Sequence, residues 1–435
     1  MTFHIYTLGC KVNSYESDVM SDDLKNHGYI EVPLTEPADI SIINTCSVTN
    51  TADQKSRKLI HHVRKQNPGG IVVAVGCSIQ NSGSSVDDGV ADILIGNVGK
   101  SKITEFISEY VKTNEKQASI SAIDHVKFET MKLNNFSKTR AFVKIQDGCN
   151  NFCSYCIIPY TRGNVRSKLA KDVLEEVYTL VKNGHKEIVL TGIHTGGYGL
   201  DLDDYGFADL LYELVQIKGL ERIRISSIEI TELNTHVLKL IKEYSILVDH
   251  LHIPLQSGSN TVLKRMNRKY NTSEFIAKVN EIRSIRPNIS LTTDVIVGFP
   301  GETEEEFLET IDTIKRVGFS KLHVFPYSRR TGTAADTMEN QIPEPIKKER
   351  VHSLIALSKE LEQAYFEKFI GSEMVVLSET EKDGYLTGHT GNYLTVKWPG
   401  SKEELNQDAV VKLASLEYPY LIGKKVETRE TMPSH

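Results

Sequence analysis

The chain has 435 residues, of which 40% are hydrophobic and 25% charged, and its formal net charge is −6. This length predicts two or three domains rather than one core, with the composition of a globular protein. The absence of any run of eighteen apolar residues argues against a membrane span, and the negative charge argues against a broad nucleic-acid-binding surface, leaving local basic patches to bind any RNA.

The first residues and the use of cysteine predict the cellular compartment of the protein. Residues 1–6 lack the basic and apolar regions of a signal peptide, so we expect a cytoplasmic protein. Structural disulfides are rare in a reducing compartment, where clustered cysteines more often bind metal or react. The six cysteines are therefore candidate ligands.

Strand-like and helix-like segments alternate over residues 1–113. Such alternation indicates a Rossmann-like parallel sheet flanked by helices. We expect strands at residues 3–8, 38–44, 71–75 and 93–96, and helices at residues 15–26, 53–66 and 101–112.

One set of three cysteines follows these strands. Cys10, Cys46 and Cys77 each lie just past the end of a different expected strand. The carboxyl ends of parallel strands form the ligand crevice of an open sheet. The three thiols, although distant in sequence, are therefore predicted to converge on one site.

The rest of the chain divides into three segments. Residues 114–139 are polar and weakly periodic, which predicts a linker with room for short strands. Six strand–helix units over residues 140–370 predict a partial barrel with its functional loops at the strands' carboxyl ends, and short strands with turn signals over residues 371–435 predict a small β-barrel. The expected barrel strands are 141–145, 187–190, 222–225, 250–253, 290–297 and 321–324; the helices are 171–183, 207–217, 234–243, 261–266, 273–285, 303–317 and 346–369; the last strands are 374–378, 385–388, 394–398 and 410–416.

A second set of cysteines follows the first barrel strand. Cys149, Cys153 and Cys156 have the spacing C-x3-C-x2-C. Three thiolates on one loop can hold three corners of an iron–sulfur cube, whereas a fully protein-ligated cube takes four. The fourth iron would remain open to a small molecule. Zinc is the alternative, but structural zinc prefers four protein ligands, and no histidine lies nearby in the sequence.

The second cysteine motif resembles the signature of radical S-adenosylmethionine (SAM) enzymes, whose open iron binds SAM. Over nearly its whole length the chain further resembles the methylthiotransferases of that superfamily, through the motifs TLGCKVN (7–13), NTCSVT (44–49), VGC (75–77), IPYTRG (158–163), HIPLQSG (252–258) and DVIVGFPGE (294–302). The resemblance implies an α/β chain with a methylthiotransferase domain (1–113), a linker (114–139), a partial (β/α)6 radical SAM barrel (140–370) and an OB-like TRAM barrel (371–435).

The same resemblance implies the cofactors and their ligands. Cys149, Cys153 and Cys156 would hold the [4Fe–4S] cluster that binds SAM. The N-terminal cysteines would hold a second [4Fe–4S] cluster, whose open iron binds the sulfur to be inserted. The SAM contacts carried over are Tyr155, Thr191, Gly192, Ser227, Glu229, Gln256, Ile296 and Gly298.

The residues also allow less specific readings. The glycines could serve turn geometry alone, Tyr155 could merely pack, and Glu229 could be an exposed loop carboxylate.

Clusters of Lys and Arg are usually solvated, although the pair Arg329 and Arg330 follows the last barrel strand. Other basic groups are Arg162, Arg166 and Lys168, then Lys264, Arg265, Arg268 and Lys269, and finally Lys347, Lys348 and Arg350.

The C-terminal segment departs from what an RNA-gripping module should show. Residues 371–435 carry seven Lys/Arg and ten Asp/Glu, a net charge of −3. RNA recognition there would depend on a few side chains, with Tyr385, Tyr393 and Trp398 as stacking surfaces or as core residues.

The run LGCKVNSYES (8–17), together with GHTGNY (388–393), most resembles the family branch that acts on threonylcarbamoyladenosine beside the tRNA anticodon. This implies a transferase that inserts a methylthio group at C2 of that base. Its partners would be the anticodon stem–loop and an electron donor such as flavodoxin or ferredoxin; the sulfur source stays open. An arginine would suit the carboxylate of the substrate.

Four alternatives to this function remain. Two are the other branches of the family, which act on isopentenyladenosine in tRNA and on an aspartate of a ribosomal protein. The others are a non-catalytic iron–sulfur electron-transfer protein and a structural zinc protein that binds RNA.

Overall fold

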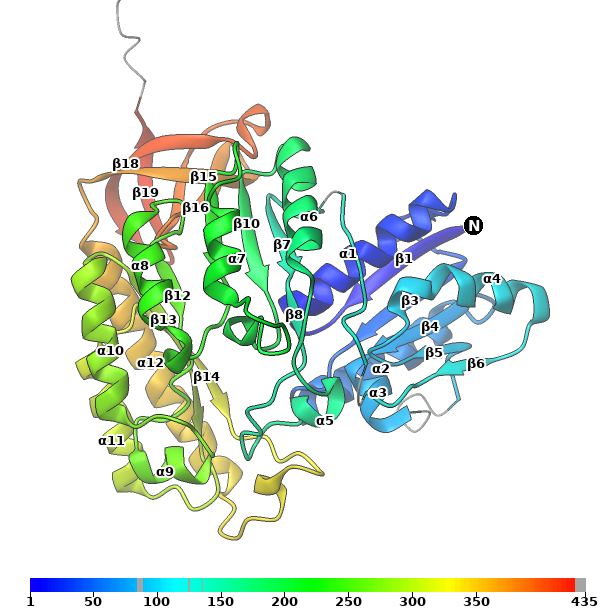
Figure 1. Ribbon diagram of the computed structural model, residues 1–435, viewed down its shortest axis with the longest axis horizontal. Coiled ribbons are helices and arrows are strands. Elements are labelled where there is room, and N and C mark those ends of the chain that lie inside the picture. The colour runs from blue at the N-terminus through cyan, green and yellow to red at the C-terminus, as the bar shows by residue number, and fades with distance from the viewer. Residues whose placement is uncertain (84–88, 124–125, 135, 427–435) are drawn as a thin grey trace, which may run out of the picture.

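Three packed units follow one another in the computed structural model, which describes residues 1–83, 89–123, 126–134 and 136–426 (Figure 1). A parallel sheet with its helices lies beside a partial barrel, and a small closed barrel covers one end of the partial one. The expected α/β class is confirmed. None of the helices in the described residues has the length and apolar character that a membrane crossing needs.

The N-terminal unit is a six-stranded parallel sheet in the order β2-β1-β3-β4-β5-β6. Its middle strands are buried runs rich in isoleucine and valine, as expected for a sheet covered on both faces. The strands are β1 (Thr2–Thr7), β2 (Ile30–Glu31), β3 (Ile40–Thr45), β4 (Ile71–Gly76), β5 (Ile93–Ile95) and β6 (Gln117–Ser119); the helices are α1 (Lys11–Asn26), α2 (Asn50–Gln66), α3 (Cys77–Ser82), η2 (Lys100–Lys102) and α4 (Ile103–Thr113).

Two helices of this unit begin earlier than the sequence pattern indicated. Helices α1 and α2 start at Lys11 and Asn50, rather than at residues 15 and 53, because polar first turns hide their beginnings. The Thr49 hydroxyl caps α2 by accepting a hydrogen bond from the Ala52 N–H at 3.1 Å. Strand β6 lies within the segment expected to be a linker, and it is too short and polar to give a periodic signal.

The central unit is an arc of two three-stranded parallel sheets, β11-β10-β7 and β12-β13-β14, joined by single bridges. The predicted partial barrel is therefore confirmed. Its strands are β7 (Arg140–Lys144), β10 (Glu187–Thr191), β11 (Arg222–Ile225), β12 (His250–His252), β13 (Ser290–Val297) and β14 (Lys321–Pro326); its helices are α6 (Ala170–Lys182), η3 (Thr195–Gly197), α7 (Phe207–Leu214), η4 (Ile230–Glu232), α8 (Thr235–Glu243), α9 (Asn260–Arg265), α10 (Thr272–Ile285), α11 (Glu304–Val317), η5 (Ala334–Asp336) and α12 (Glu344–Glu367).

The C-terminal unit is a closed barrel in the order β15-β16-β17-β19-β18. Its last strand was not expected from the sequence, yet it closes the barrel by pairing with both β17 and β18. Trp398 is fully buried in the core of this barrel, so its ring is not a stacking surface for RNA. The elements are β15 (Glu373–Lys382), β16 (Tyr385–Thr390), β17 (Thr395–Pro399), η6 (Lys402–Glu404), β18 (Asp408–Glu417) and β19 (Tyr420–Lys425).

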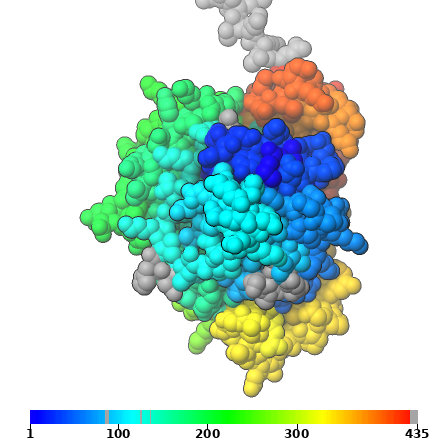
Figure 2. All heavy atoms as spheres, turned by 90° about the vertical axis from the view of Figure 1, so that its right-hand side faces the viewer, coloured from blue at the N-terminus to red at the C-terminus, as the bar shows by residue number. Residues whose placement is uncertain are grey.

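The N-terminal unit spans both edges of the barrel arc. Helix α1 packs along β7, where the buried Tyr15 joins the barrel core and its hydroxyl lies 2.8 Å from Glu176 Oε1. At the other edge, the Asn50 N–H donates to Ser328 Oγ at 3.1 Å. Figure 2 shows the blue and cyan N-terminal unit bordering the yellow segment that follows β14. The sheet therefore covers the open side of the partial barrel.

Tyr393 fastens the C-terminal barrel to the base of the partial barrel. Its ring stacks on His250, with centroids 4.7 Å apart, and receives the guanidinium groups of Arg224 at 4.6 Å and Arg140 at 5.3 Å. Arg140 and His250 are the first residues of β7 and β12. The contact therefore lies at the amino ends of the strands, away from the cysteine loop.

Tyr393→Ala should lower the free energy of unfolding by about 2 kcal/mol, because it removes a stacked ring and two cation–π contacts. Tyr385 is a matched control, since its half-exposed ring has only Lys397 over it, and Tyr385→Ala should cost less than about 1 kcal/mol. Urea denaturation of both variants checks the difference. Equal losses would show that the Tyr393 contact does not hold the two barrels together.

Candidate active site between the N-terminal unit and the barrel

The first three cysteines converge at the carboxyl edge of the N-terminal sheet. Cys10 precedes α1, Cys46 follows β3, and Cys77 begins α3. The Cys77 thiol acts electrostatically on both other thiols, so the three sulfurs share one neighbourhood. Gly9 has φ +96°, and a Cβ there would lie 2.6 Å from Cys46 Sγ. A glycine before Cys10 is thus what lets these two loops approach.

Burial and neighbouring charges change the pKa of two of these thiols. Burial raises the pKa of Cys46 to about 11, and it also raises the pKa of Cys10, whose residue keeps some exposed surface although its sulfur is crowded. Free thiols here are therefore protonated near neutral pH, and binding a metal would release their protons. The buried Arg162 guanidinium opposes the effect of burial at both residues, and so favours the thiolate form that a metal needs.

The second three cysteines lie on a tight loop between β8 (Gln146–Asp147) and α5 (Ile158–Arg162), which β9 (Arg166–Ser167) supports. Gly148 begins the loop with φ +75°, and a Cβ there would collide with the Asn164 carbonyl. The Cys149 N–H donates to the Gly163 carbonyl at 2.9 Å, which ties the loop to the end of α5.

This loop directs polar hydrogens toward its sulfurs. The Asn151 N–H lies 3.5 Å from Cys149 Sγ, and Arg268 Nη1 lies 3.2 Å from Cys153 Sγ. Burial raises the pKa of Cys149 to about 11 and that of Cys156 to about 12. Donors aimed at sulfur are among the features that stabilise an iron–sulfur cluster and set its potential.

The donor set fits two cubes, each with one open iron. The chain has six cysteines, which divide three and three, so neither group can find a fourth thiolate. Among the described residues, no group of three His, Cys, Asp or Glu side chains is arranged to hold a single metal ion.

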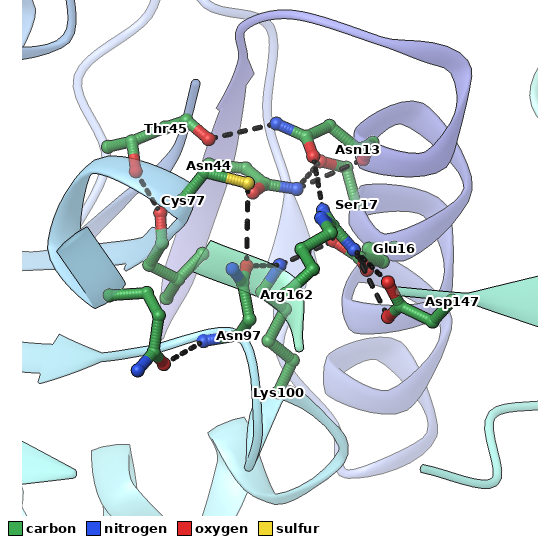
Figure 3. Close-up of polar contacts among 12 residues, drawn as sticks. Asn13, Glu16, Ser17, Asn44, Thr45, Cys77, Asn97, Lys100, Asp147 and Arg162 are labelled. Atoms are coloured by element: carbon green, nitrogen blue, oxygen red, sulfur yellow. Dashed lines mark hydrogen bonds and ion pairs between the residues drawn. The ribbon is translucent and has the colours of Figure 1, made fainter. Parts of the chain in front are cut away.

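A buried guanidinium lies between the two cysteine groups. Arg162, the last residue of α5, is fully buried and donates to Glu16 at 3.0 Å, Asp147 at 3.1 Å and Asn13 at 3.0 Å. Figure 3 shows Arg162 between the Glu16 and Asp147 carboxylates on one side and Asn97 and Cys77 on the other. It thus joins α1, directly after Cys10, to the loop that carries Cys149.

Two lysines complete this network. Lys100 pairs with Glu16, and Lys144 lies 2.7 Å from both Glu16 and Asp147. Burial disfavours the charged carboxylates, but Arg162 and the lysines outweigh it and hold the pKa of both carboxyls well below the usual range. From the sequence we expected Arg162 only as one of several basic residues, and its acidic partners were not foreseen. Glu16 follows Cys10 on α1 and Asp147 precedes Cys149, and this proximity in the chain was their one signal.

One cavity of about 210 Å³ has walls from both cysteine loops. Val48 and Thr49 follow Cys46, while Tyr155 and Cys156 belong to the second loop, and all four line the cavity. Two expected SAM contacts, Gln256 and Ile296, line it as well. A larger hollow of about 540 Å³ lies between the base of the barrel and the C-terminal unit, and no cysteine lines it.

One polar side chain in the wall of the small cavity has an acceptor atom without a partner among the described residues. Gln256 has φ +64°, and its buried Oε1 has no hydrogen-bond partner among the described residues. An unsatisfied buried acceptor is what a ligand amino group would complete. Glu229, in contrast, is engaged by Arg268.

The remaining expected SAM contacts lie at the strand ends. Thr191 ends β10, and Gly192 follows it against Gln146. Ser227, just after β11, is exposed. Gly298 lies directly against the Lys347 side chain of α12, which gives this glycine a packing role of its own.

Known protein families match two segments of this chain. Residues 143–314 match the radical SAM superfamily, and residues 2–96 match an uncharacterized protein family, UPF0004. The chain is 44% identical to the threonylcarbamoyladenosine tRNA methylthiotransferase MtaB of Bacillus subtilis, over 99% of this chain and 97% of that protein. The chain belongs to the radical SAM tRNA methylthiotransferase family. It is therefore an enzyme that transfers a methylthio group, and its family uses SAM and a [4Fe–4S] cluster.

Other relatives of this methylthiotransferase lie in two branches. MtaB of Aquifex aeolicus is 40% identical over 91% of this chain and 96% of its own length. A tRNA-2-methylthio-N(6)-dimethylallyladenosine synthase of Lachnoclostridium phytofermentans is 36% identical over 98% and 96%. Among solved structures, the radical SAM methyltransferase TsrM of Kitasatospora setae, with cobalamin and a [4Fe–4S] cluster bound, has a TM-score of 0.56 over 77% of this chain and 76% of its own at 13% identity, a likeness of fold.

Arg162→Met should destabilise the protein by about 3–5 kcal/mol, because it leaves buried carboxylates short of a partner. Since the pKa of Glu16 and Asp147 is lowered by folding, their stabilisation is present above the ordinary carboxyl pKa and is lost only as pH falls through the lower folded value. In the variant these pKa values rise, so acid unfolding should begin at a higher pH. Circular dichroism during acid titration measures this.

Lys278→Met provides the control, since Lys278 forms a largely exposed pair with Glu281 at 2.7 Å. A surface pair contributes at most about 1 kcal/mol. The same acid midpoint in wild type and Arg162→Met would contradict the assigned role of Arg162.

Proposed function

We propose that this enzyme inserts a methylthio group at C2 of a threonylcarbamoyl-modified adenosine beside the anticodon of tRNA. The observation that carries the proposal is a cavity whose walls come from both cysteine loops. The names of the relatives at 38–44% identity support the threonylcarbamoyl branch.

The proposal assigns a role to each group of cysteines. Cys149, Cys153 and Cys156 hold the cluster that binds SAM, and Cys10, Cys46 and Cys77 hold a second [4Fe–4S] cluster, which carries the sulfur to be inserted. When bound, the first cluster and SAM supply the electron transfer and radical chemistry that remove a hydrogen atom from the base.

The protein's own residues position these groups and exclude water. Tyr155, Gln256 and Ile296 would contact SAM at the cavity, and their positions in its wall support this. Thr191, Gly192, Ser227, Glu229 and Gly298 would contact SAM from the neighbouring strand ends. Arg162 fixes the two cysteine loops relative to one another through its bonds to Glu16 and Asp147.

The basic face of α2 is proposed to bind the tRNA backbone. The helix carries five Lys and Arg residues and one acidic residue, and Lys55, Lys58 and Lys65 are exposed. Its amino end reaches the cavity, because the Asn50 amide donates to the Arg329 carbonyl at 2.6 Å beside Ser328 in the wall. A phosphate backbone on this face would therefore lead toward the cavity mouth.

Exposed aromatic side chains near the cavity suit an unstacked base. Phe325 lines the cavity and is 45% exposed. Phe152 and Tyr160, from the second cysteine loop and α5, are exposed and form an edge-to-face pair with centroids 5.9 Å apart. Enzymes that act on a base take it out of the stack and hold it against aromatic groups. These rings are proposed to receive the bases around the target adenosine.

The other parts of the proposal concern the setting of the reaction. The electron donor would be a flavodoxin or ferredoxin, and the compartment the cytoplasm. The units would serve as a methylthiotransferase domain (1–113), a linker (114–139), a radical SAM domain (140–370) and a TRAM domain (371–435).

Two cysteine variants test the division of labour. Cys149→Ala should abolish release of 5′-deoxyadenosine from SAM, because it removes a ligand of the SAM-binding cluster. Cys46→Ala should still release 5′-deoxyadenosine but form no methylthio product. Chromatography of the reaction products measures both. Normal product from Cys46→Ala would overturn the assignment.

The substrate branch is tested in a strain that lacks the protein, by mass spectrometry of the tRNA nucleosides. This strain should lose the methylthio mark only from threonylcarbamoyladenosine. The wild-type gene should restore the mark, and each cysteine variant is introduced in the same way for comparison. Loss only from isopentenyladenosine would assign the enzyme to the other branch. An unchanged set of nucleosides would exclude a tRNA substrate.

Lys55→Glu with Lys58→Glu should weaken binding of the anticodon stem–loop by about ten- to a hundredfold and reduce the salt slope by about two, since two phosphate contacts are lost. The matched control is Lys239→Glu with Lys242→Glu on α8, on the opposite side of the molecule (Figure 1). Fluorescence anisotropy at several salt concentrations compares the pairs. Equal weakening in both would mean that α2 is only a solvated face.

A further inference from the structure

Lys11 lies between the two cysteine-bearing units. It directly follows Cys10 and is the first residue of α1. Its side chain leaves the N-terminal unit and places Nζ 3.4 Å from Ser226 Oγ, just past the end of β11. The residue keeps exposed surface. Lys11 therefore reaches from the position after Cys10 to the carboxyl end of β11.

Six arginines of the central unit are already occupied. Each has a carboxylate partner: Arg140 pairs with Glu379, Arg162 with Asp147, Arg224 with Glu187, Arg268 with Glu229, Arg329 with Asp336, and Arg330 with Asp53. None of them is free to take a carboxylate from a ligand without giving up one of its own.

Lys11 differs from all of these cations. In the described parts of the chain it forms no ion pair, and its one hydrogen bond is the long contact with Ser226. The ammonium group therefore has no counter-ion among the described residues, and a ligand carboxylate would supply one through a charge-assisted hydrogen bond.

We propose that Lys11 binds the carboxylate of the substituent on N6 of the target adenosine, and so selects a carboxylated base over one with an apolar substituent. The inference rests on the proposed function, in which sulfur held beside Cys10 is delivered to C2. In adenine, C2 and C6 flank N1, so a group on N6 and a group arriving at C2 share one edge of the ring. A residue next to Cys10 is placed to reach that substituent.

The selectivity follows from charge. An ammonium–carboxylate contact is a charge-assisted hydrogen bond, which is stronger than a neutral one. A hydrocarbon substituent at the same place would cover the ammonium without pairing it, and would be rejected for that reason. From the sequence we expected an arginine in this role, whereas the structure points to a lysine because these arginines are paired.

The test compares binding of two anticodon stem–loops to the cluster-loaded enzyme, one with threonylcarbamoyladenosine and one with unmodified adenosine. Wild type should prefer the carboxylated RNA. Lys11→Met should lose about ten- to a hundredfold of affinity for that RNA alone, while Lys11→Arg should keep most of the preference. Iron content and 5′-deoxyadenosine release without RNA verify that Cys10 and the clusters are intact.

Lys58→Met supplies the matched comparison, because an exposed lysine on α2 should affect both RNAs equally. If Lys11→Met keeps the wild-type ratio of affinities, or weakens both RNAs alike, Lys11 does not read the carboxylate. If wild type itself shows no preference for the carboxylated RNA, the proposed function fails at the substrate branch. The two failures are thus distinguishable.

Discussion

The buried ion network around Arg162 is the constraint on which the rest of the site depends. A guanidinium removed from water is tolerated only where its hydrogen bonds and its charge are met. Here the partners come from two units of the fold: Glu16 and Asn13 from α1, and Asp147 from the loop before Cys149. Any sliding of the N-terminal sheet against the barrel would leave several charges buried and unpaired. The network therefore fixes the distance between the two cysteine groups.

This fixed relation is what the two proposed metal sites on separate units would need in order to serve one reaction. A shared cavity requires that the loops after Cys46 and before Cys156 form one wall, which they do. The small size of one residue also brings cysteines together, because Gly9 lets the loops that carry Cys10 and Cys46 approach each other. The proposed function also requires an open iron on each cluster, which two groups of three thiols would leave.

Charge is distributed unevenly over this protein, and the distribution separates structural from recognition roles. Most buried cations are paired and hold units together, as Arg224 does with Glu187 beneath Tyr393. The C-terminal barrel is net acidic, its Trp398 is in the core, and its Tyr393 contacts the partial barrel. Lys11 and the lysines of α2 are exposed instead, and Lys11 forms no ion pair among the described residues. Lys11 directly follows Cys10, and the amino end of α2 reaches the cavity wall.

The sequence by itself determined the fold class, the family and both groups of cysteines, because apolar periodicity and cysteine spacing are local properties of the chain. It missed strand β19 and the starts of α1 and α2, where short or polar segments give no period. Only the tertiary structure decided that Arg162 is a buried link, that Trp398 is core, and that Lys11 lacks a counter-ion. Those facts depend on which residues distant in sequence become neighbours, and spacing along the chain does not encode that.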